Sequence, residues 1–424
     1  MANQSDNSTI DTTYDVLIVG GGMVGASLAV ALMPLKLKVG MVDAFEFGVS
    51  EQPSYDDRAI ALSYGSSRIY QGMGLWAELE AKTTAIEKIH ISDRGHFGAT
   101  RLRAKKEKVP ALGYLVESRV LGKQLYNVLS DSDVDIIAPA TVTNLTEIES
   151  GLEITLLKNN KKSKVSTRLL VASDGTNSKV RELSGIGVNR SEYQQSAVIA
   201  NISTEKPHNN EAFERFTDDG PIALLPLSDN RCSLVWTHNT KHGSDDLEST
   251  LALDDKAFLK KLGKEFGYRL GRFTKVGKRS SFPLALVTSQ ENTATRTVII
   301  GNASHTMHPV AGQGLNLALR DIAVLADLIA QNIESNDVGN IDLLKAYDEQ
   351  RAGDVKTTVR YTDSLVRLFS NDNFLLGHAR AGGLLAVDRF SPLRKWVTRQ
   401  SMGINYRQSR LARGLDLVTS EARQ

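Results

Sequence analysis

The sequence predicts an α/β protein in which a doubly wound domain, discontinuous in sequence, contains an inserted and mainly antiparallel β domain and is followed by a helical C-terminal region. Three observations lead to this fold class. A strand, a glycine turn, a helix and a second strand follow one another near the N-terminus. A second strand–loop–helix unit begins near residue 297, and the sequence between the two units is typical of short antiparallel strands.

Composition and charge exclude several classes of protein. The chain has 424 residues, enough for about two to three domains. It has 51 basic and 49 acidic residues, so no charge excess indicates a nucleic-acid partner or a disordered chain. Cys232 is the single cysteine, which excludes an internal disulfide and argues against a cysteine-based metal site. We therefore expect a globular protein without a metal, and a cytoplasmic location.

The N-terminal part contains an uncharged segment that is long enough to cross a bilayer, Val16 to Leu35. Four glycines interrupt it, and acidic rather than basic residues precede it, the reverse of a signal peptide. We therefore interpret it as a buried strand (Asp15–Val19), a glycine turn and a helix (Ala26–Leu35), with a second strand at Lys38–Asp43. The polar residues 1–12 are expected to form a disordered tail.

The turn between this strand and helix has the pattern G-x-G-x-x-G, formed by Gly20, Gly22 and Gly25. Glycines at these positions allow a tight turn, close approach of a pyrophosphate and close packing of helix on strand. Asp43 ends the second strand, 18 residues after Gly25, near the distance expected for an acid that binds ribose hydroxyls. The unit predicts a dinucleotide site at the N-terminus of the helix.

The middle of the chain alternates short strands with turns. Strands are expected at 86–93, 100–103, 151–157, 165–172, 195–202, 211–216, 222–227 and 232–237, and one long strand at Arg272–Ala285. Helices are expected at Glu117–Ser130 and Asp255–Phe266, after the strand Thr297–Ile300 as far as Gln331, and from Leu343 onward.

Two further elements follow strands and contain glycine. The first begins at Asp174, and its sequence fits a helix cap as well as a ligand site. The second runs from Gly301 and Asn302 through a Pro/Gly loop to Asn316. Such a loop places backbone N–H groups and the positive end of a helix dipole beside a ligand, although a plain strand–loop–helix connection would have a similar composition.

In this order, the three elements resemble the flavoprotein aromatic hydroxylases of the hydroxybenzoate hydroxylase fold. Residues 55–63 (YDDRAIALS) and 308–317 (HPVAGQGLNL) are similar to a narrower family, the FAD-dependent monooxygenases of ubiquinone biosynthesis. Asn302, where most of the superfamily has Asp, and residues 91–96, 212–217 and 231–236 are similar to the members that hydroxylate 2-polyprenyl-6-methoxyphenol. Residues 172–173 depart from the pattern, with Ala-Ser in place of Gly-Ala.

The resemblance implies a discontinuous Rossmann-like FAD-binding domain and a substrate domain. We place the FAD-binding domain at residues 13–75, 110–185 and 285–365, the substrate domain at 76–109 and 186–284, and the C-terminal helical region at 366–413. The residues implied in FAD binding are Gly20, Gly22, Gly25, Asp43, Arg58, Arg119, Asp174, Gly301, Asn302, Gly312, Gln313, Gly314, Leu315 and Asn316. Arg58 and Arg119 would neutralise the pyrophosphate, unless they are ordinary surface arginines.

The resemblance also implies the reaction. NAD(P)H, bound transiently because a second G-x-G-x-x-G unit is missing, or a protein electron donor reduces FAD. O2 then gives a flavin C4a-hydroperoxide that hydroxylates a prenylated phenol in ubiquinone synthesis. His308 and Pro309 are the candidate catalytic residues beside the flavin, although His308 would serve equally well as a brace for the loop. Hydroxylation at a sister ring position, a small soluble phenol as substrate, and a flavin-holding scaffold without turnover are the alternatives.

Aromatic and aliphatic residues of the middle strands are candidates for the wall of a substrate pocket, although core packing is the commoner use of such residues. They are Phe213, Phe216, Leu224, Pro226, Trp236 and Phe282. The stretch Phe374–Met402 mixes apolar and basic residues. It is expected to pack on the FAD-binding domain or to contact a membrane or other ubiquinone-biosynthesis proteins, with peripheral association at the inner membrane.

Overall fold

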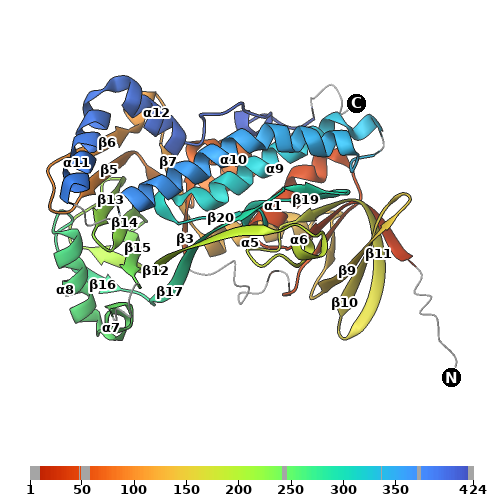
Figure 1. Ribbon diagram of the computed structural model, residues 1–424, viewed down its shortest axis with the longest axis horizontal. Helices are drawn as coiled ribbons and strands as arrows, with labels where there is room; N and C mark the ends of the chain where they lie inside the picture. The colour runs from red at the N-terminus through yellow and green to blue at the C-terminus, as the bar shows by residue number, and fades with distance from the viewer. Residues whose placement is uncertain are drawn as a thin grey trace.

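The computed structural model describes residues 10–46, 48, 58–240, 246–335, 337–369 and 374–418, and shows two large sheets with long helices across them (Figure 1). Among these residues, the helices include none with the length and hydropathy needed to cross a membrane. Residues 1–9 of the expected tail lie outside the described part. Ile10 to Thr12 belong to the first strand, because Ile10 pairs with Lys164, so the tail was predicted too long.

The first sheet is built around parallel strands in the order β19-β11-β1-β2-β8. Their bounds are β1 Ile10–Val19, β2 Val39–Val42, β8 Asp135–Ile137, β11 Lys161–Ala172 and β19 Thr297–Ile299. β18 (Thr293–Ala294) pairs antiparallel with β19, and the antiparallel strands β9 (Thr141–Ile148) and β10 (Gly151–Lys158) continue from β11. Val16, Leu17 and Ile18 have no exposed surface, as expected for a central parallel strand.

Three helices bury one face of this sheet. They are α1 (Met23–Leu32), α5 (Ser118–Ser130) and α9 (Gln313–Gln331), and they share one apolar core with the sheet. α10 (Ile341–Phe369) lies along α9, as Figure 1 shows. The short helices α2 (Tyr64–Gly72), α3 (Trp76–Glu80), α4 (Ala104–Glu107) and α6 (Lys179–Leu183) complete this half of the molecule and its connections.

The second sheet has the order β20-β17-β12-β15-β14-β13-β5-β6 and is antiparallel except for the pair β13–β5. Its strands are β5 Lys88–Asp93, β6 Ala99–Arg103, β12 Val188–Thr204, β13 Glu211–Thr217, β14 Gly220–Pro226, β15 Arg231–Asn239, β16 Phe273–Val276, β17 Ser280–Ser289 and β20 His305–Thr306. Helices α7 (Asp246–Ala252) and α8 (Asp255–Phe266) lie beside it in Figure 1, and Phe258 and Leu262 of α8 share a core with its strands.

A small sheet and the C-terminal helices join the two halves. β3 (Ala59–Ser63), β7 (Gly113–Glu117) and β4 (Thr84–Ile86) form the small sheet in the order β3-β7-β4. α11 (Phe374–Arg389) and α12 (Ser391–Ser401) lie at the end of the second sheet. The chain then returns to the first half, where the N–H of Gly65 in α2 donates to the carbonyl of Met402 at 2.8 Å.

The α/β class with a mainly antiparallel domain and a helical C-terminal region is confirmed. The long strand expected at Arg272–Ala285 is wrong, because the chain breaks into β16 and β17, which pair with different parts of β12. Our exact domain boundaries stay predictions. The second sheet draws β20 from residues that we assigned to the FAD-binding domain, because β20 pairs with the end of β17.

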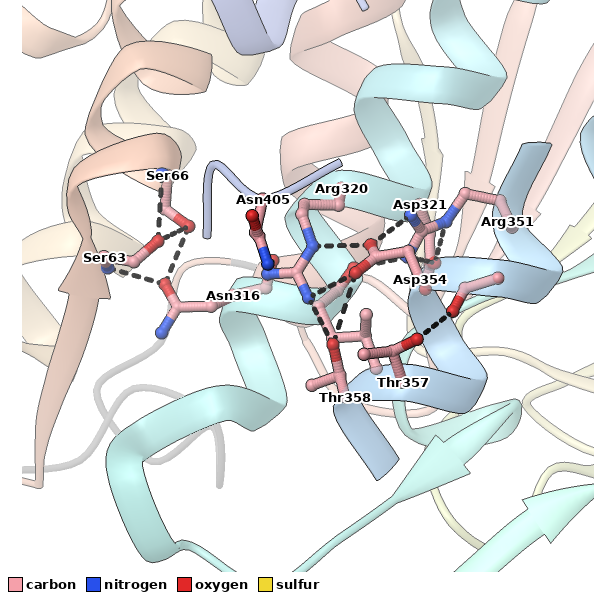
Figure 2. A network of polar contacts seen from close by, with 12 residues as sticks. Ser63, Ser66, Asn316, Arg320, Asp321, Arg351, Asp354, Thr357, Thr358 and Asn405 are labelled. Atoms are coloured by element: carbon pink, nitrogen blue, oxygen red, sulfur yellow. Dashed lines mark hydrogen bonds and ion pairs between the residues drawn. The ribbon is translucent and has the colours of Figure 1, made fainter. Parts of the chain in front are cut away.

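A buried network of charged side chains fixes α9, α10 and the loop after β19 to one another (Figure 2). Asp321 of α9 accepts hydrogen bonds from Arg351 of α10 at 2.8 Å and from Nε2 of His305 at 2.7 Å. Asp354 accepts from both Arg320 (2.7 Å) and Arg351 (2.6 Å). Burial alone would raise the pKa of Asp321, but Arg351 and His305 lower the pKa below its ordinary value. The network therefore stays charged inside the fold.

We expect Arg351→Met to lower the free energy of unfolding by about 3–5 kcal/mol, because it leaves two buried carboxylates without their shared cation. Arg367→Met on the same helix is the control, since the Arg367 side chain is 60% exposed in its pair with Asp363. We expect that change to cost less than about 1 kcal/mol. Urea denaturation measures both, and equal losses in the two variants would contradict the prediction.

Candidate active site

The carboxyl ends of the parallel strands bring the predicted cofactor residues to one edge of the first sheet. Gly20 follows β1, Asp43 follows β2, Asp174 follows β11 and Gly301 follows β19. The strand order changes direction at β1, because β2 lies on one side of it and β11 on the other. Ligands of open α/β sheets bind at such switch points.

Gly20 and Gly25 hold helix α1 directly against the sheet. Gly20 has a φ of +102°, and a Cβ there would lie 2.5 Å from the carbonyl oxygen of Ser173. A Cβ at Gly25 would lie 1.8 Å from the carbonyl oxygen of Gly20. Gly22 is the N-cap of α1 and has no side chain to occupy the orphan N–H groups of the first turn. The turn therefore leaves these donors for an anion.

Asp43 lies beside this turn and is 7% exposed. Its two carboxylate oxygens accept hydrogen bonds from the N–H groups of Gly21 and Phe45. Burial raises the pKa of Asp43, and these two hydrogen bonds partly oppose the rise. The carboxylate is thus held in one position at the end of β2, where a ribose hydroxyl of a dinucleotide would approach.

Asp174 caps a helix and keeps one oxygen without a hydrogen-bond partner among the described residues. Its Oδ2 accepts from the N–H groups of Lys179 (2.8 Å) and Val180 (3.2 Å), so it caps the start of α6. Its Oδ1 is buried and has no hydrogen-bond partner among the described residues. A buried acceptor without a partner is costly, so this oxygen indicates a ligand donor.

Arg58 and Arg119 lie at neighbouring strand ends of the small sheet, where the N–H of Ser118 donates to the carbonyl of Arg58 at 2.7 Å. Arg119 is 60% exposed and pairs with Glu117 at 2.6 Å, and the Arg58 guanidinium lies 5.2 Å from the centre of the Phe282 ring. Binding of pyrophosphate by these arginines stays a prediction. Residues 55–57 of the stretch that precedes Arg58 lie outside the described part of the chain.

Arg181 is a structural residue that sequence reasoning gave no function. It is 8% exposed and donates to the carbonyls of Ala303 (2.7 Å) and Thr176 (3.0 Å). It therefore ties the loop after β11 to the loop after β19. The sequence signal that could have identified it is its position three residues after the helix cap Ser178. Side chains in the first turn of a helix point back toward its N-terminus, which brings Arg181 over the loop.

The loop after β19 leads into the N-terminus of α9. The side chain of Asn302 is exposed at its start. Gly312 is the N-cap of α9, and Gln313, Gly314 and Leu315 form the first turn. A Cβ at Gly314 would meet no atom within 4 Å. The first turn of a long helix, with its unpaired N–H groups and positive dipole end, therefore faces open space at Gly314.

The side chain of Asn316 makes all of its hydrogen bonds within the protein. Its Oδ1 accepts from the N–H of Ser63 and the hydroxyl of Ser66, and its Nδ2 donates to the carbonyls of Ala61 and Gly312 (Figure 2 shows the two serine contacts). These four bonds use the full capacity of an amide side chain. The side chain therefore holds β3 and α2 against α9 and positions the loop, and FAD binding at Asn316 stays a prediction.

His308 is buried, with 1% of its surface exposed. Its Nδ1 accepts from the N–H of Val310 at 3.1 Å, and the Tyr193 ring meets the imidazole edge-on at 5.4 Å. Burial lowers the pKa of His308 to about 4, so the ring is neutral at pH 7 and carries its proton on Nε2. This Nε2 has no hydrogen-bond partner among the described residues. The contacts with Val310 and Tyr193 fit a brace for the loop.

An apolar cavity of about 430 Å³ adjoins the loop. Pro309, Gly312 and β3 form one wall, the second sheet forms another, and α10, α11 and α12 close it. Most lining side chains are apolar, among them Ile89, Ile91, Leu225, Val235, Leu365, Leu384 and Val397. Its size and lining are those of a small-molecule site.

The cavity is lined by only part of the residues predicted for a substrate pocket. Phe213 and Phe216 line the cavity. Leu224 and Trp236 are buried on the other face of the sheet, where they share a core with Phe258 of α8, while Ala223, Leu225 and Val235 face the cavity. Pro226 has the same strand parity as Leu224 and does not line the cavity, and Phe282 packs under Arg58. Leu224 and Trp236 therefore point to the face of the sheet opposite the cavity, and their place in a substrate pocket stays an untested prediction.

The cavity lining also contains polar residues that sequence reasoning did not assign to a pocket. Glu214 of β13 and Tyr361 of α10 both line the cavity. Burial raises the pKa of the Tyr361 phenol, and the nearby charge of Glu214 raises it further. Glu214 stands in the stretch 212–217, whose polar–apolar alternation places an acid among core residues. No sequence signal marked Tyr361, because it lies on a helix about 150 residues after Glu214.

The chain is similar to several characterised proteins. A family model described as an FAD binding domain matches residues 13–362. Ubiquinone hydroxylase UbiL of Rhodospirillum rubrum is 37% identical over 417 residues, covering 96% of this chain and 94% of the relative. The 3-demethoxyubiquinol 3-hydroxylase of Escherichia coli is 30% identical over 404 residues, covering 92% and 98%. The structure of p-nitrophenol 4-monooxygenase PnpA from Pseudomonas putida shares the fold, with a TM-score of 0.77, 14% identity and coverage of 94% and 100%.

The residues at the sheet edge fit FAD. The glycine turn leaves donors for a pyrophosphate, Asp43 holds a carboxylate for a ribose, and the buried Oδ1 of Asp174 lacks a donor. The open space at Gly314 gives room for a planar ring beside the helix terminus. FAD is therefore the cofactor, and the cavity at Pro309 and Gly312 lies against the loop that would receive its ring.

We expect Gly314→Leu to weaken FAD binding by at least tenfold, because the side chain would occupy the open space at the start of α9. Gly353→Leu is the matched control, since Gly353 is also helical and a Cβ there also meets no atom within 4 Å. Flavin fluorescence during titration measures the dissociation constant. Equal affinity in both variants would show that the ring does not lie at Gly314.

We expect His308 to make stability depend on pH. The unfolded histidine takes up a proton near pH 6.5, whereas the folded one does so only at about 4. Stability from this group is therefore complete above pH 6.5 and decreases as the pH falls toward 4, by about 2–3 kcal/mol. Urea denaturation of His308→Asn at several pH values should show a loss smaller by that amount. A variant with the same pH slope as the wild type would argue against a neutral, buried His308.

Proposed function

Because the chain belongs to the FAD-dependent monooxygenases of ubiquinone biosynthesis, we propose that it hydroxylates a 2-polyprenyl-6-methoxyphenol to the corresponding 1,4-benzoquinol. The ring hydroxyl directs attack to the ortho and para carbons, so the reaction needs little acid–base machinery from the protein. The substrates would be the prenylated phenol and O2. FAD, when bound, supplies the chemistry that activates oxygen.

The observation that carries this proposal is the apolar cavity beside the cofactor loop. Pro309 and Gly312 belong to the loop and line the cavity, so a phenol ring at this end would lie next to the flavin. Side chains of α10, α11 and α12, such as Leu368, Leu393 and Val397, line its remaining walls. A polyprenyl tail needs a long apolar surface, and these walls offer one.

Residues of this chain would supply binding, orientation and water exclusion. The N-terminus of α9 favours negative charge on the reduced ring. Glu214 and Tyr361 face the cavity and are suited to orient the phenol hydroxyl and methoxy oxygens. The neutral His308 holds Val310 and so shapes the loop behind Pro309, while the apolar walls keep water from the reacting centre. In this proposal Pro309 contacts the ring and His308 positions the loop.

The electron donor would be NAD(P)H bound transiently, or another protein. The sequence has one strand–glycine–helix unit with an acid after the second strand, and FAD uses it. A reduced nicotinamide would therefore have to approach the flavin through an open groove.

A second candidate is hydroxylation of the same kind of ring at another position. The observation that favours it is the name of the Escherichia coli relative, a 3-demethoxyubiquinol 3-hydroxylase, over nearly the whole chain. The two candidates differ in the intermediate that would accumulate without the enzyme.

We expect cells that lack this protein to lose ubiquinone and to accumulate polyprenyl-methoxyphenol during aerobic growth. Mass spectrometry of extracted quinone lipids measures both. Accumulation of a demethoxy-ubiquinol would support the second candidate instead. Unchanged lipids, in a strain without another hydroxylase of this family, would contradict both.

Complementation of the same strain with variants tests whether the prenylated substrate binds in the cavity. Ala386→Phe places a ring into the cavity from α11, whereas Ala352→Phe adds the same ring on the exposed side of α10. We expect Ala386→Phe to restore less than about a tenth of the wild-type ubiquinone level and Ala352→Phe to restore the full level. Equal restoration with equal protein levels would show that the prenylated substrate does not use this cavity.

We further propose that α11 and α12 contact the membrane from which a prenylated phenol must be taken. Phe390, Leu393 and Trp396 are exposed by 65%, 41% and 44%. Arg389, Arg394, Lys395 and Arg399 stand among them, which is the composition of a helix that lies on an anionic bilayer. Trp396 also touches the ring of Tyr361 at 6.0 Å, so this surface reaches the wall of the cavity.

We expect the double variant Phe390→Ser and Trp396→Ser to bind phosphatidylglycerol vesicles at least fivefold more weakly while it keeps its FAD. Ile341→Ser, which removes a 60% exposed side chain at the start of α10, is the control. Single-residue changes are used because α11 and α12 also line the cavity, so removing these helices would change both sites. Co-sedimentation with vesicles measures binding, and undiminished binding of the double variant would contradict the proposal.

A further inference from the structure

A second, polar pocket lies at the far end of the second sheet. Its volume is about 580 Å³, and it is formed by β5, β6, β13, the segment after α8 and the outer side of α11. The first sheet contributes no residue to it. It therefore belongs neither to the dinucleotide edge nor to the apolar cavity.

Strand alternation separates this pocket from the apolar cavity. His90 of β5, Arg101 of β6 and Arg215 of β13 line the polar pocket. Their neighbours Ile89, Thr100 and Glu214 line the apolar cavity. The same three strands thus carry the two sites on opposite faces, since successive side chains point to opposite sides of a sheet.

Three arginines from separate elements meet in the polar pocket: Arg101, Arg215 and Arg269. Among the described residues, none of the three has a carboxylate within 4 Å. Of the two acids of the pocket, only Asp93 pairs with a cation outside the three arginines, so Asp388 is left to offset one of their three charges. Asp93 pairs with Arg380 and His96, and Asp388 accepts the backbone N–H of Arg101. The pocket therefore has an excess of positive charge that this part of the chain does not neutralise.

Two buried nitrogen atoms of the lining also lack partners. Nε of Arg215 and Nδ1 of His90 have no hydrogen-bond partner within the described part of the chain. Burial and the charges of Arg269, Arg101 and Arg215 lower the pKa of His90 to about 4. Burial, Arg94 and Arg269 likewise lower the pKa of Arg215. The cationic groups thus repel one another, and an anion among them would relieve the repulsion.

The volume of the pocket and the exposed side chains at its opening suit a ligand larger than a single ion. Phe97 and Tyr268 line it and are 92% and 61% exposed, and Leu385 of α11 lines it and is 44% exposed. Arginine forks match the oxygens of a phosphate group, and exposed aromatic rings suit a planar base or an acyl chain next to that phosphate.

From this geometry we propose that the polar pocket binds a phosphate group of an organic ligand, with Arg101, Arg215 and Arg269 as its donors. The phosphate would belong to a soluble nucleotide or to the headgroup of an anionic lipid, which share this chemistry. The site is independent of the hydroxylase reaction proposed above, because it lies on the other face of the sheet.

The test is calorimetric titration of the FAD-loaded protein with inorganic pyrophosphate. We expect wild-type protein to bind it and Arg215→Gln and Arg269→Gln each to bind at least tenfold more weakly. Arg269 is exposed, so its variant keeps the test valid if Arg215→Gln fails to fold. Arg190→Gln is the matched control, since Arg190 is 54% exposed on β12 of the same sheet and pairs with Glu192.

Competition identifies the source of the phosphate. Displacement of pyrophosphate by ADP, but not by phosphatidylglycerol–phosphatidylcholine vesicles, would support a nucleotide. Displacement by these vesicles, but not by pure phosphatidylcholine vesicles, would support a lipid headgroup, provided Phe390→Ser/Trp396→Ser protein still shows it. Failure of wild-type protein to bind pyrophosphate, or equal binding by the two pocket variants and the control, would overturn the proposal.

Discussion

The buried charges of Arg320, Asp321, Arg351 and Asp354 determine where the cofactor loop lies. Asp321 joins α10 to His305 and also accepts the N–H of Gly301, so one carboxylate positions the start of β20 and the residue before Asn302. Such a network is expensive to bury, and a well-packed apolar core would stabilise the protein as much. The network makes the packing of these elements specific, because guanidinium and carboxylate groups pair in few geometries, whereas apolar side chains pack in many.

The second constraint is the alternation of side chains along β5, β6 and β13. It lets one thin layer separate an apolar cavity from a cationic pocket, with Phe213 in the lining of both. The sheet places Arg101 and Arg215 on the face away from the cavity, whereas Glu214 and Arg380 are charged residues that line the cavity itself. α11 contributes to both sites in the same way, with Leu384 in the cavity and Leu385 in the pocket.

Sequence reasoning succeeded where one short segment determines the structure. The glycine turn needs only residues 20–25, and its partner Asp43 follows from the length of one strand–helix–strand unit. It failed where the result depends on distant partners. The face of Leu224 and Trp236 is decided by α8, which packs on that side, and the function of Asn316 is decided by Ser63 and Ala61, about 250 residues earlier. The sequence near Leu224, Trp236 or Asn316 contains no signal for these distant partners.

The order of the parallel strands has a consequence for folding during synthesis on the ribosome. β1 is finished by residue 19, yet its neighbour β11 ends at residue 172 and β19 at residue 299. The antiparallel domain can close from strands that are near in sequence, while the nucleotide edge waits for the last third of the chain, a long-range assembly that is slow. Residues 402–413 then fasten onto α2. β1 can therefore pair with β2 early in synthesis, but the sheet edge that binds the cofactor is complete only after β19 has been made.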